Sequence, residues 1–376
     1  MREKKFMNQQ RHKRVIITGG GTGGHVFPAI SIANALRKID KDIEILFVGA
    51  EGKMEMEKVP AAGYRIVGLP VAGISRKNIL KNFSVLIKLL KSLSLAKKTL
   101  REFKPDVAVG VGGYASGPVL NQAGKMGIPV LIQEQNGYAG VTNKLLAKKA
   151  SAICVAYDGM EKYFPAEKII KTGNPVRQNF DNLGSLKEDA FRFFGLNDSL
   201  PVILILGGSL GAKTINKCLS NNLEALRNSD CQWLWQTGKY YYDDVMKLFP
   251  VKAAGNISVH SFIDRMDFAF AAAGIIISRA GAGTISELCL VGKPVILVPS
   301  PNVAEDHQTR NAMALARKNA AIVIPDGMAE KSLVNEAINL VSDNQKKKTL
   351  SQNIAGMAER DADMRIAREV LKLIKE

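Results

Sequence analysis

The chain has 376 residues, of which 46% are hydrophobic and 23% charged, and its formal net charge is +17. The length is too great for one ordinary core and the composition excludes a disordered chain, so two folded domains are expected. The excess of basic residues favours partners that carry phosphate, such as nucleic acid, anionic lipid or a nucleotide.

The four cysteines are widely spaced and include no C-x-x-C pair, which predicts reduced thiols rather than disulfides or a zinc site. The basic start, MREKKFMNQQRHKR, precedes only a short VIIT run, so no signal peptide is expected. The apolar stretch FAFAAAGIIIS is about half of the ~20 residues that a membrane span needs. We therefore expect a cytoplasmic protein that is soluble or at most lies on a membrane.

Short apolar runs alternate with helical patterns along almost the whole chain. In chain order, the predicted strands are RVIIT (14–18), IEILFVG (43–49), DVAVGVG (106–112), PVLIQE (129–134), AICVA (152–156), PVILILGG (201–208), QWLWQTG (232–238), ISVHSF (257–262), GIIISRA (274–280), PVILVPS (294–300) and AAIVIP (320–325). Short apolar strands separated by helices are typical of parallel sheets covered on both faces, which predicts the α/β class.

The two halves of the chain repeat one pattern. RVIITGGGTGGHVFPAI and PVILILGGSLGAKTIN each show a strand, a glycine turn and a helix, which predicts two doubly wound domains. The expected hinge lies in KTGNPVRQNF (171–180), where glycine and proline interrupt the pattern. The final stretch, MRIAREVLKLIK (364–375), is predicted to be an amphipathic helix.

The first glycine turn fits G-x-G-x-x-G through Gly19, Gly21 and Gly24, a pattern found in dinucleotide sites. Within it, Thr22 is able to accept a backbone N–H or to donate to a phosphate oxygen. The alternative is a tight strand-to-helix turn that holds no ligand.

Two further glycine turns precede predicted helices. GGSLGA places Ser209 at a helix start, either as part of an anion site or as a plain N-cap. In RAGAGTISEL, Gly281 and Gly283 open the backbone, and Thr284-x-x-Glu287 has the spacing of a capping box. The alternative role for Glu287 is to accept a pair of sugar hydroxyls. Three such turns predict ligand binding beyond the strand ends, in one interdomain cleft.

Seven motifs closely resemble the MurG family in order and spacing: GGGTGGHVFPA, GVGGYASGP, LIQEQNGYAGVTNK, TGNPVR, GGSLGA, RAGAGTISEL and DHQTRNA. The family transfers GlcNAc from UDP-GlcNAc to undecaprenyl-diphospho-MurNAc-pentapeptide (lipid I), which gives lipid II. The resemblance implies a GT-B fold of two Rossmann-like domains that face a cleft. It implies an acceptor domain over 1–175 with a C-terminal helix at about 355–376, and a UDP-GlcNAc domain over 176–354.

The resemblance also implies roles for individual residues. Thr22, Gly23 and Gly24 would line the donor cleft from the acceptor side, and Asn136 would face the sugar. The other implied contacts are Arg177 and Ser209 near the diphosphate, Ile263 with Phe262 at uracil, Glu287 at the ribose, Gln308 at the GlcNAc hydroxyls, and the turn residues Ala282, Gly283 and Thr284. The chain departs from the family pattern at Gly283, where some members have a bulkier apolar residue. It also departs at His307, where others have glutamine, so His307 receives no sugar-binding role.

Family members invert the anomeric carbon, which requires one displacement and a base near the acceptor hydroxyl. His25 is the first candidate because it leaves the glycine turn and titrates near neutrality; the alternative is a packing role at a helix start. Glu134 is the second candidate, with orientation of Asn136 as its alternative role. Helix N-termini and Arg177 would stabilise the departing diphosphate. No D-x-D pair suits a bridging Mg²⁺, so neither a metal nor a cofactor is expected.

The segment 74–104 combines lysines and arginines with Ile74, Ile79, Phe83, Leu86 and Leu90 at roughly helical spacing. This pattern predicts a helix that lies on an anionic membrane, at the cytoplasmic face of the bacterial inner membrane. The alternative is an ordinary amphipathic helix whose lysines form a solvated face.

Three rival functions stay open at this stage. One is another GT-B enzyme that acts on a UDP-sugar, either a transferase or a UDP-GlcNAc 2-epimerase. The second is a dehydrogenase, suggested by the G-x-G-x-x-G and by Glu51 after the second strand. The third is an RNA-binding protein, suggested by the charge, but no RNA-binding motif is present and no nucleic-acid partner is expected.

Overall fold

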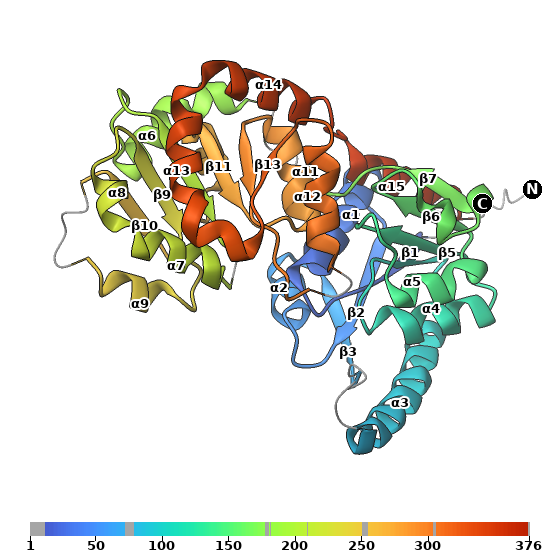
Figure 1. The fold of residues 1–376 in the computed structure, drawn as a ribbon. Coiled ribbons are helices and arrows are strands. Elements are labelled where there is room, and N and C mark those ends of the chain that lie inside the picture. Colours follow the sequence, from blue (N-terminus) through green and yellow to red (C-terminus); the bar gives the residue numbers. More distant parts are fainter. Residues whose placement is uncertain are drawn as a thin grey trace, which may run out of the picture. The chain divides into compact units, whose positions relative to one another are not determined.

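The computed structural model describes residues 12–71, 79–176, 180, 182–208, 210–249, 255–303 and 306–374, with only the backbone described for 79–84. The chain forms two compact units (Figure 1). Unit 1 comprises Met1–Val176 and Asp361–Glu376, and unit 2 comprises Arg177–Arg360. Each unit is built on one parallel sheet, so the predicted α/β class is confirmed.

The sheet of unit 1 has seven strands in the order β3-β2-β1-β4-β5-β6-β7, and every neighbouring pair is parallel. The strands are β1 (Arg14–Thr18), β2 (Glu44–Ala50), β3 (Arg65–Leu69), β4 (Val107–Gly110), β5 (Val130–Glu134), β6 (Ala152–Val155) and β7 (Ile169–Lys171). The sequence did not predict β3 and β7. Both are edge strands with partly exposed residues, so neither shows the uniformly apolar run of a central strand.

Helices cover both faces of this sheet because alternate strand residues point to opposite sides. Val15 and Ile17 face α1 and α15, whereas Ile16 faces α3 and α4. The helices of unit 1 are α1 (Gly23–Ile39), α2 (Glu55–Ala61), α3 (Ile79–Phe103), α4 (Ser116–Lys125), α5 (Val141–Leu146) and α15 (Ala362–Lys372). The chain terminus therefore returns to unit 1, where Ile366 and Val370 of α15 are buried.

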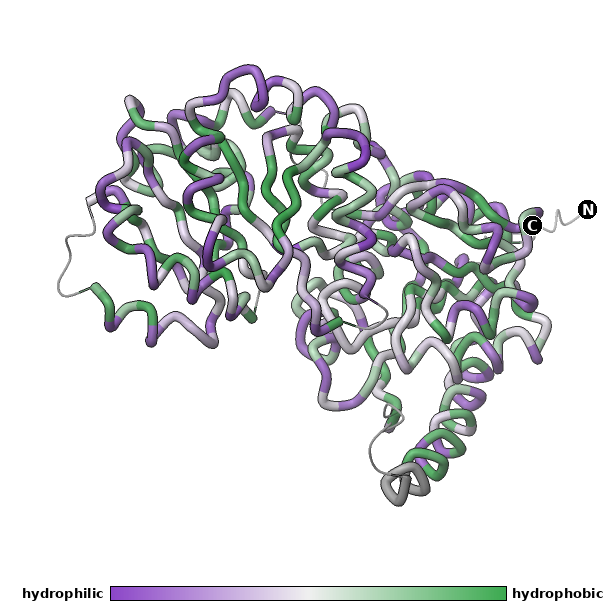
Figure 2. The backbone as a smooth tube through the Cα atoms, in the orientation of Figure 1, coloured by the Kyte–Doolittle hydropathy of each residue, from purple (hydrophilic) through white to green (hydrophobic). Residues whose placement is uncertain are grey.

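The sheet of unit 2 has six parallel strands in the order β10-β9-β8-β11-β12-β13. The strands are β8 (Val202–Leu206), β9 (Gln232–Gln236), β10 (Ile257–His260), β11 (Ile275–Ser278), β12 (Val295–Leu297) and β13 (Ile322–Val323). The covering helices are α6 (Lys187–Phe194), α7 (Lys213–Asn221), α8 (Leu223–Arg227), α9 (Tyr242–Met246), α10 (Met266–Ala272), α11 (Ala282–Val291), α12 (His307–Ala316), α13 (Ala329–Ser342) and α14 (Asn344–Ala355). Figure 2 shows the hydrophobic residues gathered along the strands.

Both sheets reverse their strand order once. In unit 1 the reversal lies between β1 and β4, and in unit 2 it lies between β8 and β11. The chain leaves each of these four strands at the same sheet edge, into a glycine-containing turn. Ligands of open α/β sheets bind at such reversal points, beyond the carboxyl ends of the strands. The fold therefore provides one candidate half-site in each unit.

Candidate functional site

In unit 1, the turns that follow β1 and β4 pack backbone against backbone. Gly20 N–H donates to the Gly112 carbonyl at 3.3 Å. A Cβ on Gly113, whose φ is +90°, would lie 2.3 Å from the Gly20 oxygen. The Ser116 hydroxyl, at the start of α4, lies 3.0 Å from the Thr18 carbonyl and 2.9 Å from that of Gly112, and so links the two strand ends. This close approach explains why glycines are needed here.

Protein groups already occupy the N–H groups of the first glycine turn itself. Gly19 donates to Val48 at 3.4 Å, Gly20 to Gly112, and Gly21 to the Glu55 carboxylate at 2.8 Å. The next N–H groups open α1, and the N-cap residue Thr22 makes no side-chain capping bond to them. Because the first N–H groups of a helix have no intrahelical partner, a ligand would bind at the start of α1, from Gly23 onward, rather than at Gly19–Gly21.

His25 lies at this helix start and is half-buried. Its Nδ1 lies 3.2 Å from the Gly20 carbonyl oxygen and 3.3 Å from Thr22 Oγ1. Its Nε2 lies 2.8 Å from the position that a Cβ on Gly112 would take, so a larger residue there would displace the ring. The ring is thus held at the reversal point of the sheet, as a candidate base requires, and its part in proton transfer stays a prediction.

Glu134 ends β5 with only 2% of its surface exposed, and it binds its own loop. One oxygen accepts from the backbone N–H of Asn136 at 3.1 Å and from its side-chain amide at 3.4 Å. The other accepts from Gly140 N–H at 2.9 Å and from the Asn143 amide at 2.8 Å. A buried carboxylate with four donors is poorly placed to accept a substrate proton, so the geometry favours its alternative role of orienting Asn136.

The sequence reasoning missed two parts of unit 1 that shape this half-site. The first is Glu55, which is buried in α2 and lies 34 positions along the chain from its partner Gly21. The second is a buried amide network, in which Gln133 donates to Asn174 at 3.2 Å and Asn174 donates to the Gln135 carbonyl at 3.0 Å. Asn174 belongs to the TGNPVR motif, so this motif ties the unit boundary to the end of β5. Neither contact was predictable from the sequence, because isolated polar residues among polar and apolar neighbours form no recognisable motif.

In unit 2, the turn after β8 contacts the loops that follow β9 and β10. A Cβ on Gly238, whose φ is +81°, would lie 2.2 Å from the nitrogen of Gly211. Gln236, the last residue of β9, donates to the Gly208 carbonyl at 3.3 Å and accepts the N–H of Ile263 at 3.0 Å. The N–H of Ile263 is therefore already hydrogen-bonded, so its carbonyl is the backbone group to consider for contact with a nucleobase. Two further predicted residues, Arg177 and Ser209, lie outside the described residues.

The helix α11 begins after the turn that follows β11. Gly281 is its N-cap in extended conformation, and no side chain caps it. Of the two alternatives for Thr284 and Glu287, the capping box does not fit, because the helix starts at Ala282 and Thr284 already lies within its first turn. A Cβ on Gly283 would meet nothing within 4 Å, so a bulkier family residue also fits there. The start of α11 carries no side-chain cap and follows a strand at the reversal point, so it is a candidate anion-binding feature of unit 2.

The loops around this helix start are held by Gln308 and by an ion pair that the sequence analysis missed. Gln308 Oε1 accepts from Ser300 N–H at 2.9 Å and from the N–H of Ala280 at 3.3 Å, which leaves its amide nitrogen as the donor for a ligand. Arg279 donates to Asp326, and its side chain is only 16% exposed. The other Asp326 oxygen accepts from Thr214 at 2.8 Å, so the pair links the first turn of α7 to the turn that follows β11.

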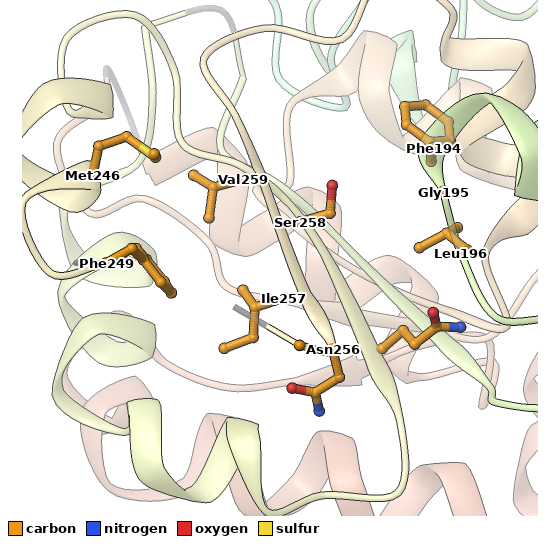
Figure 3. Close-up of a pocket in the computed structure, with 11 residues that line it drawn as sticks. Phe194, Gly195, Leu196, Met246, Phe249, Asn256, Ile257, Ser258 and Val259 are labelled. Carbon is orange, nitrogen blue, oxygen red and sulfur yellow. The ribbon is translucent and has the colours of Figure 1, made fainter. Parts of the chain in front are cut away.

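A cavity in unit 2 lies apart from the predicted site residues. The cavity of about 300 Å³ in Figure 3 lies beside the edge strand β10, between Phe194, Met246 and Phe249, and none of the predicted residues lines it. Among the described residues, no three His, Cys, Asp or Glu side chains are grouped to hold a metal ion. The same residues include no helix long and apolar enough to cross a membrane.

Comparison with known proteins identifies relatives over almost the whole chain. The N-terminal domain model of glycosyltransferase family 28 matches residues 15–155, and the C-terminal domain model matches residues 202–366. A Parabacteroides distasonis protein is 60% identical over 364 residues, which cover 97% of this chain and 99% of its own length. Its name is UDP-N-acetylglucosamine--N-acetylmuramyl-(pentapeptide) pyrophosphoryl-undecaprenol N-acetylglucosamine transferase.

A Porphyromonas gingivalis protein of the same name is 53% identical over 96% of both chains. The solved structure of MurG from Acinetobacter baumannii superposes with a TM-score of 0.75 at 29% identity, and the match covers 96% of this chain and 99% of that one.

The chain belongs to the MurG family. It is therefore a glycosyltransferase, and its two parallel-sheet units form the GT-B fold that the sequence predicted. A UDP-GlcNAc 2-epimerase from Neisseria meningitidis also superposes, with a TM-score of 0.65 at 15% identity over 96% of this chain and all of that one. At that identity the likeness shows the shared fold alone.

Proposed function

We propose that each unit of this MurG-family enzyme binds one of its two substrates. The enzyme transfers GlcNAc from UDP-GlcNAc to undecaprenyl-diphospho-MurNAc-pentapeptide, the reaction for which relatives at 52% to 60% identity are named. We assign the lipid-linked acceptor to unit 1 and UDP-GlcNAc to unit 2. The observation that supports the assignment best is the uncapped start of α11, which suits the nucleotide diphosphate of the donor.

The donor half-site is built around α11. The N–H groups at Ala282, Gly283 and Thr284 lie in its first turn, where the helix dipole favours a diphosphate. Glu287 follows one turn later, and by family resemblance it accepts the ribose hydroxyls. The carbonyl of Ile263 offers an acceptor to uracil.

Three further groups complete the proposed donor contacts. Gln308 is held by its oxygen, so its amide donates to a GlcNAc hydroxyl. By family resemblance, Arg177 and Ser209 contact the diphosphate. Charge that develops on the departing UDP is stabilised by the donors arranged around it.

In the acceptor half-site, His25 acts as the base. It takes the proton of the MurNAc 4-hydroxyl while that oxygen forms a bond to the anomeric carbon of GlcNAc. The bond from this carbon to the diphosphate oxygen breaks, UDP leaves with the electron pair, and the configuration inverts. Thr22, Gly23 and Gly24 at the start of α1 line the site, and Glu134 holds Asn136 toward the sugar.

The transfer itself has a direct test. Incubation with UDP-GlcNAc and a short-chain analogue of the lipid acceptor should release UDP only when both are present. UDP release or sugar isomerisation without the acceptor would instead support an epimerase, and oxidation of NAD(P)H would support a dehydrogenase.

The helix α3 suits the lipid part of the acceptor. Between Leu86 and Leu90, four large apolar side chains are 42% to 60% exposed, and the neighbouring Lys88 and Lys91 carry positive charge. An ordinary amphipathic helix would bury such residues, whereas this helix extends beyond the sheet of unit 1 (Figure 1). We therefore place α3 on the anionic cytoplasmic face of the inner membrane, where each basic residue contributes about 1 kcal/mol.

Vesicle flotation tests this placement. The double variant Leu86→Ser/Leu90→Ser should abolish binding to vesicles that contain anionic lipid, because the apolar side chains that insert into the membrane are lost. Serine at Met328, which is equally exposed on unit 2, should leave binding unchanged. Equal binding to neutral and anionic vesicles would contradict the electrostatic part of the proposal.

A further inference from the structure

We propose that Glu55 is a positioning residue that acts on His25 through the peptide group between Gly20 and Gly21. On one side of this group, Gly21 N–H donates to Glu55 Oε2 at 2.8 Å. On the other side, the Gly20 carbonyl oxygen lies 3.2 Å from His25 Nδ1. The carboxylate, the peptide group and the imidazole therefore form one hydrogen-bonded chain. The inference rests on the proposed function of His25 as the base.

This series of hydrogen bonds determines which nitrogen of His25 accepts a proton. A carbonyl oxygen only accepts hydrogen bonds, so the contact with Gly20 requires the proton of the neutral ring to be on Nδ1. Thr22 Oγ1, at 3.3 Å from Nδ1, is also able to accept from it. The lone pair of the neutral ring then lies on Nε2, at the side of the ring that faces Gly112. With this tautomer, Nε2 is the nitrogen that takes the proton of the acceptor hydroxyl.

Glu55 is held rigidly beneath the turn. Only 1% of its surface is exposed, and its second oxygen accepts the N–H of Ala50 at 2.9 Å. The space it fills exists because two neighbours are glycines. A Cβ on Gly20 would lie 2.0 Å from Glu55 Oε1, and one on Gly49 would lie 2.5 Å from its Cγ. The second glycine of the GGGTGG motif thus makes room for a carboxylate rather than for a ligand.

The buried carboxylate of Glu55 also strengthens this series of hydrogen bonds electrostatically. Each hydrogen bond in such a series polarises the next, by roughly 10–30% per bond. A nearby carboxylate favours the imidazolium that forms when His25 takes the proton. Of the other charged groups near this turn, Glu51 and Lys53 are exposed, and both oxygens of Glu134 accept hydrogen bonds from its own loop. Glu55 is the charge that the structure bonds to the turn.

Replacement of Glu55 by glutamine tests the role, because it keeps the size and removes the charge. We expect kcat to fall about tenfold and the acid limb of the kcat/KM profile to move to lower pH, with the KM for UDP-GlcNAc within twofold of wild type. Asp106→Asn is the matched control. Asp106 accepts the Arg14 N–H at 2.8 Å at the opposite end of β1, so this variant should keep the wild-type pH profile.

Nitrogen NMR of histidine-labelled enzyme tests the tautomer without any activity, and the wild-type spectrum suffices if the glutamine variant does not fold. The chain has four histidines, and the His25 signals are those missing in His25→Gln. We expect neutral His25 to carry its proton on Nδ1. A proton on Nε2, or an unchanged kcat and acid limb in Glu55→Gln, would overturn the proposal. Near-normal turnover of His25→Gln would instead refute His25 as the base.

Discussion

Replacement of Gly113 by alanine should disrupt the acceptor half-site from the backbone. The new Cβ would lie 2.3 Å from the Gly20 oxygen and 3.0 Å from its nitrogen, and no side chain rotation relieves a backbone clash. The φ of +90° adds about 1–2 kcal/mol for a residue with a Cβ, and overpacking adds about 1–3 kcal/mol. We therefore expect the free energy of unfolding to fall by about 2–5 kcal/mol.

The same change should reduce turnover, because the Gly20 carbonyl holds His25. A shift of about 1 Å in a catalytic group costs on the order of 100-fold in rate. Gly127→Ala is the control: its φ is +72°, but its Cβ would meet nothing within 4 Å, so only the conformational cost applies. Urea denaturation and the UDP-release assay measure both effects. Equal destabilisation by the two variants, with wild-type kcat for Gly113→Ala, would refute the reasoning.

Three further changes have defined outcomes. Asp326→Asn should lower the free energy of unfolding by about 1–3 kcal/mol in urea denaturation, because the largely buried Arg279 loses its counter-charge; an unchanged midpoint would contradict this. Burial lowers the pKa of His260 below its ordinary value, so this residue contributes to stability above the ordinary pKa, and the contribution is lost as the pH falls through the lowered pKa. His260→Gln should therefore reduce the loss of stability at acid pH, measured as the free energy of unfolding against pH. Glu134→Gln should lower kcat, because one amide oxygen replaces the two acceptor oxygens that hold Asn136, Gly140 and Asn143, yet it should keep the acid limb of the pH–rate profile. Loss of that limb would make Glu134 the base.

The sequence predicted the architecture well because the central strands are encoded locally. Runs such as VIIT and VILIL are apolar on both faces, and only a sheet covered on both sides buries them fully. The strands β3 and β7 escaped prediction because most of their residues are partly or fully exposed and their sequences are mixed in character. The glycine turns were found for the same local reason, since they follow directly after such runs.

The contacts that shape the half-sites were less predictable, because they join residues distant along the chain. Glu55 reaches Gly21 across 34 positions, and Thr214 reaches Asp326 across 112. The spacing of Thr284 and Glu287 left a capping box open as one of two alternatives, but the helix starts earlier, with Gly281 as its N-cap. Spacing indicates where a helix start lies only when no glycine upstream is able to take the N-cap position.

The central claim is that unit 1 supplies the base while unit 2 binds the donor. Its most direct test is one variant, His25→Gln, measured in two ways: UDP binding by calorimetry and GlcNAc transfer to the lipid acceptor analogue. We expect the Kd for UDP to stay within twofold of wild type, while transfer falls by about 100-fold or more, as loss of general base catalysis requires. Transfer at a near-normal rate, or a loss of UDP binding that accounts for the lost turnover, would contradict the claim.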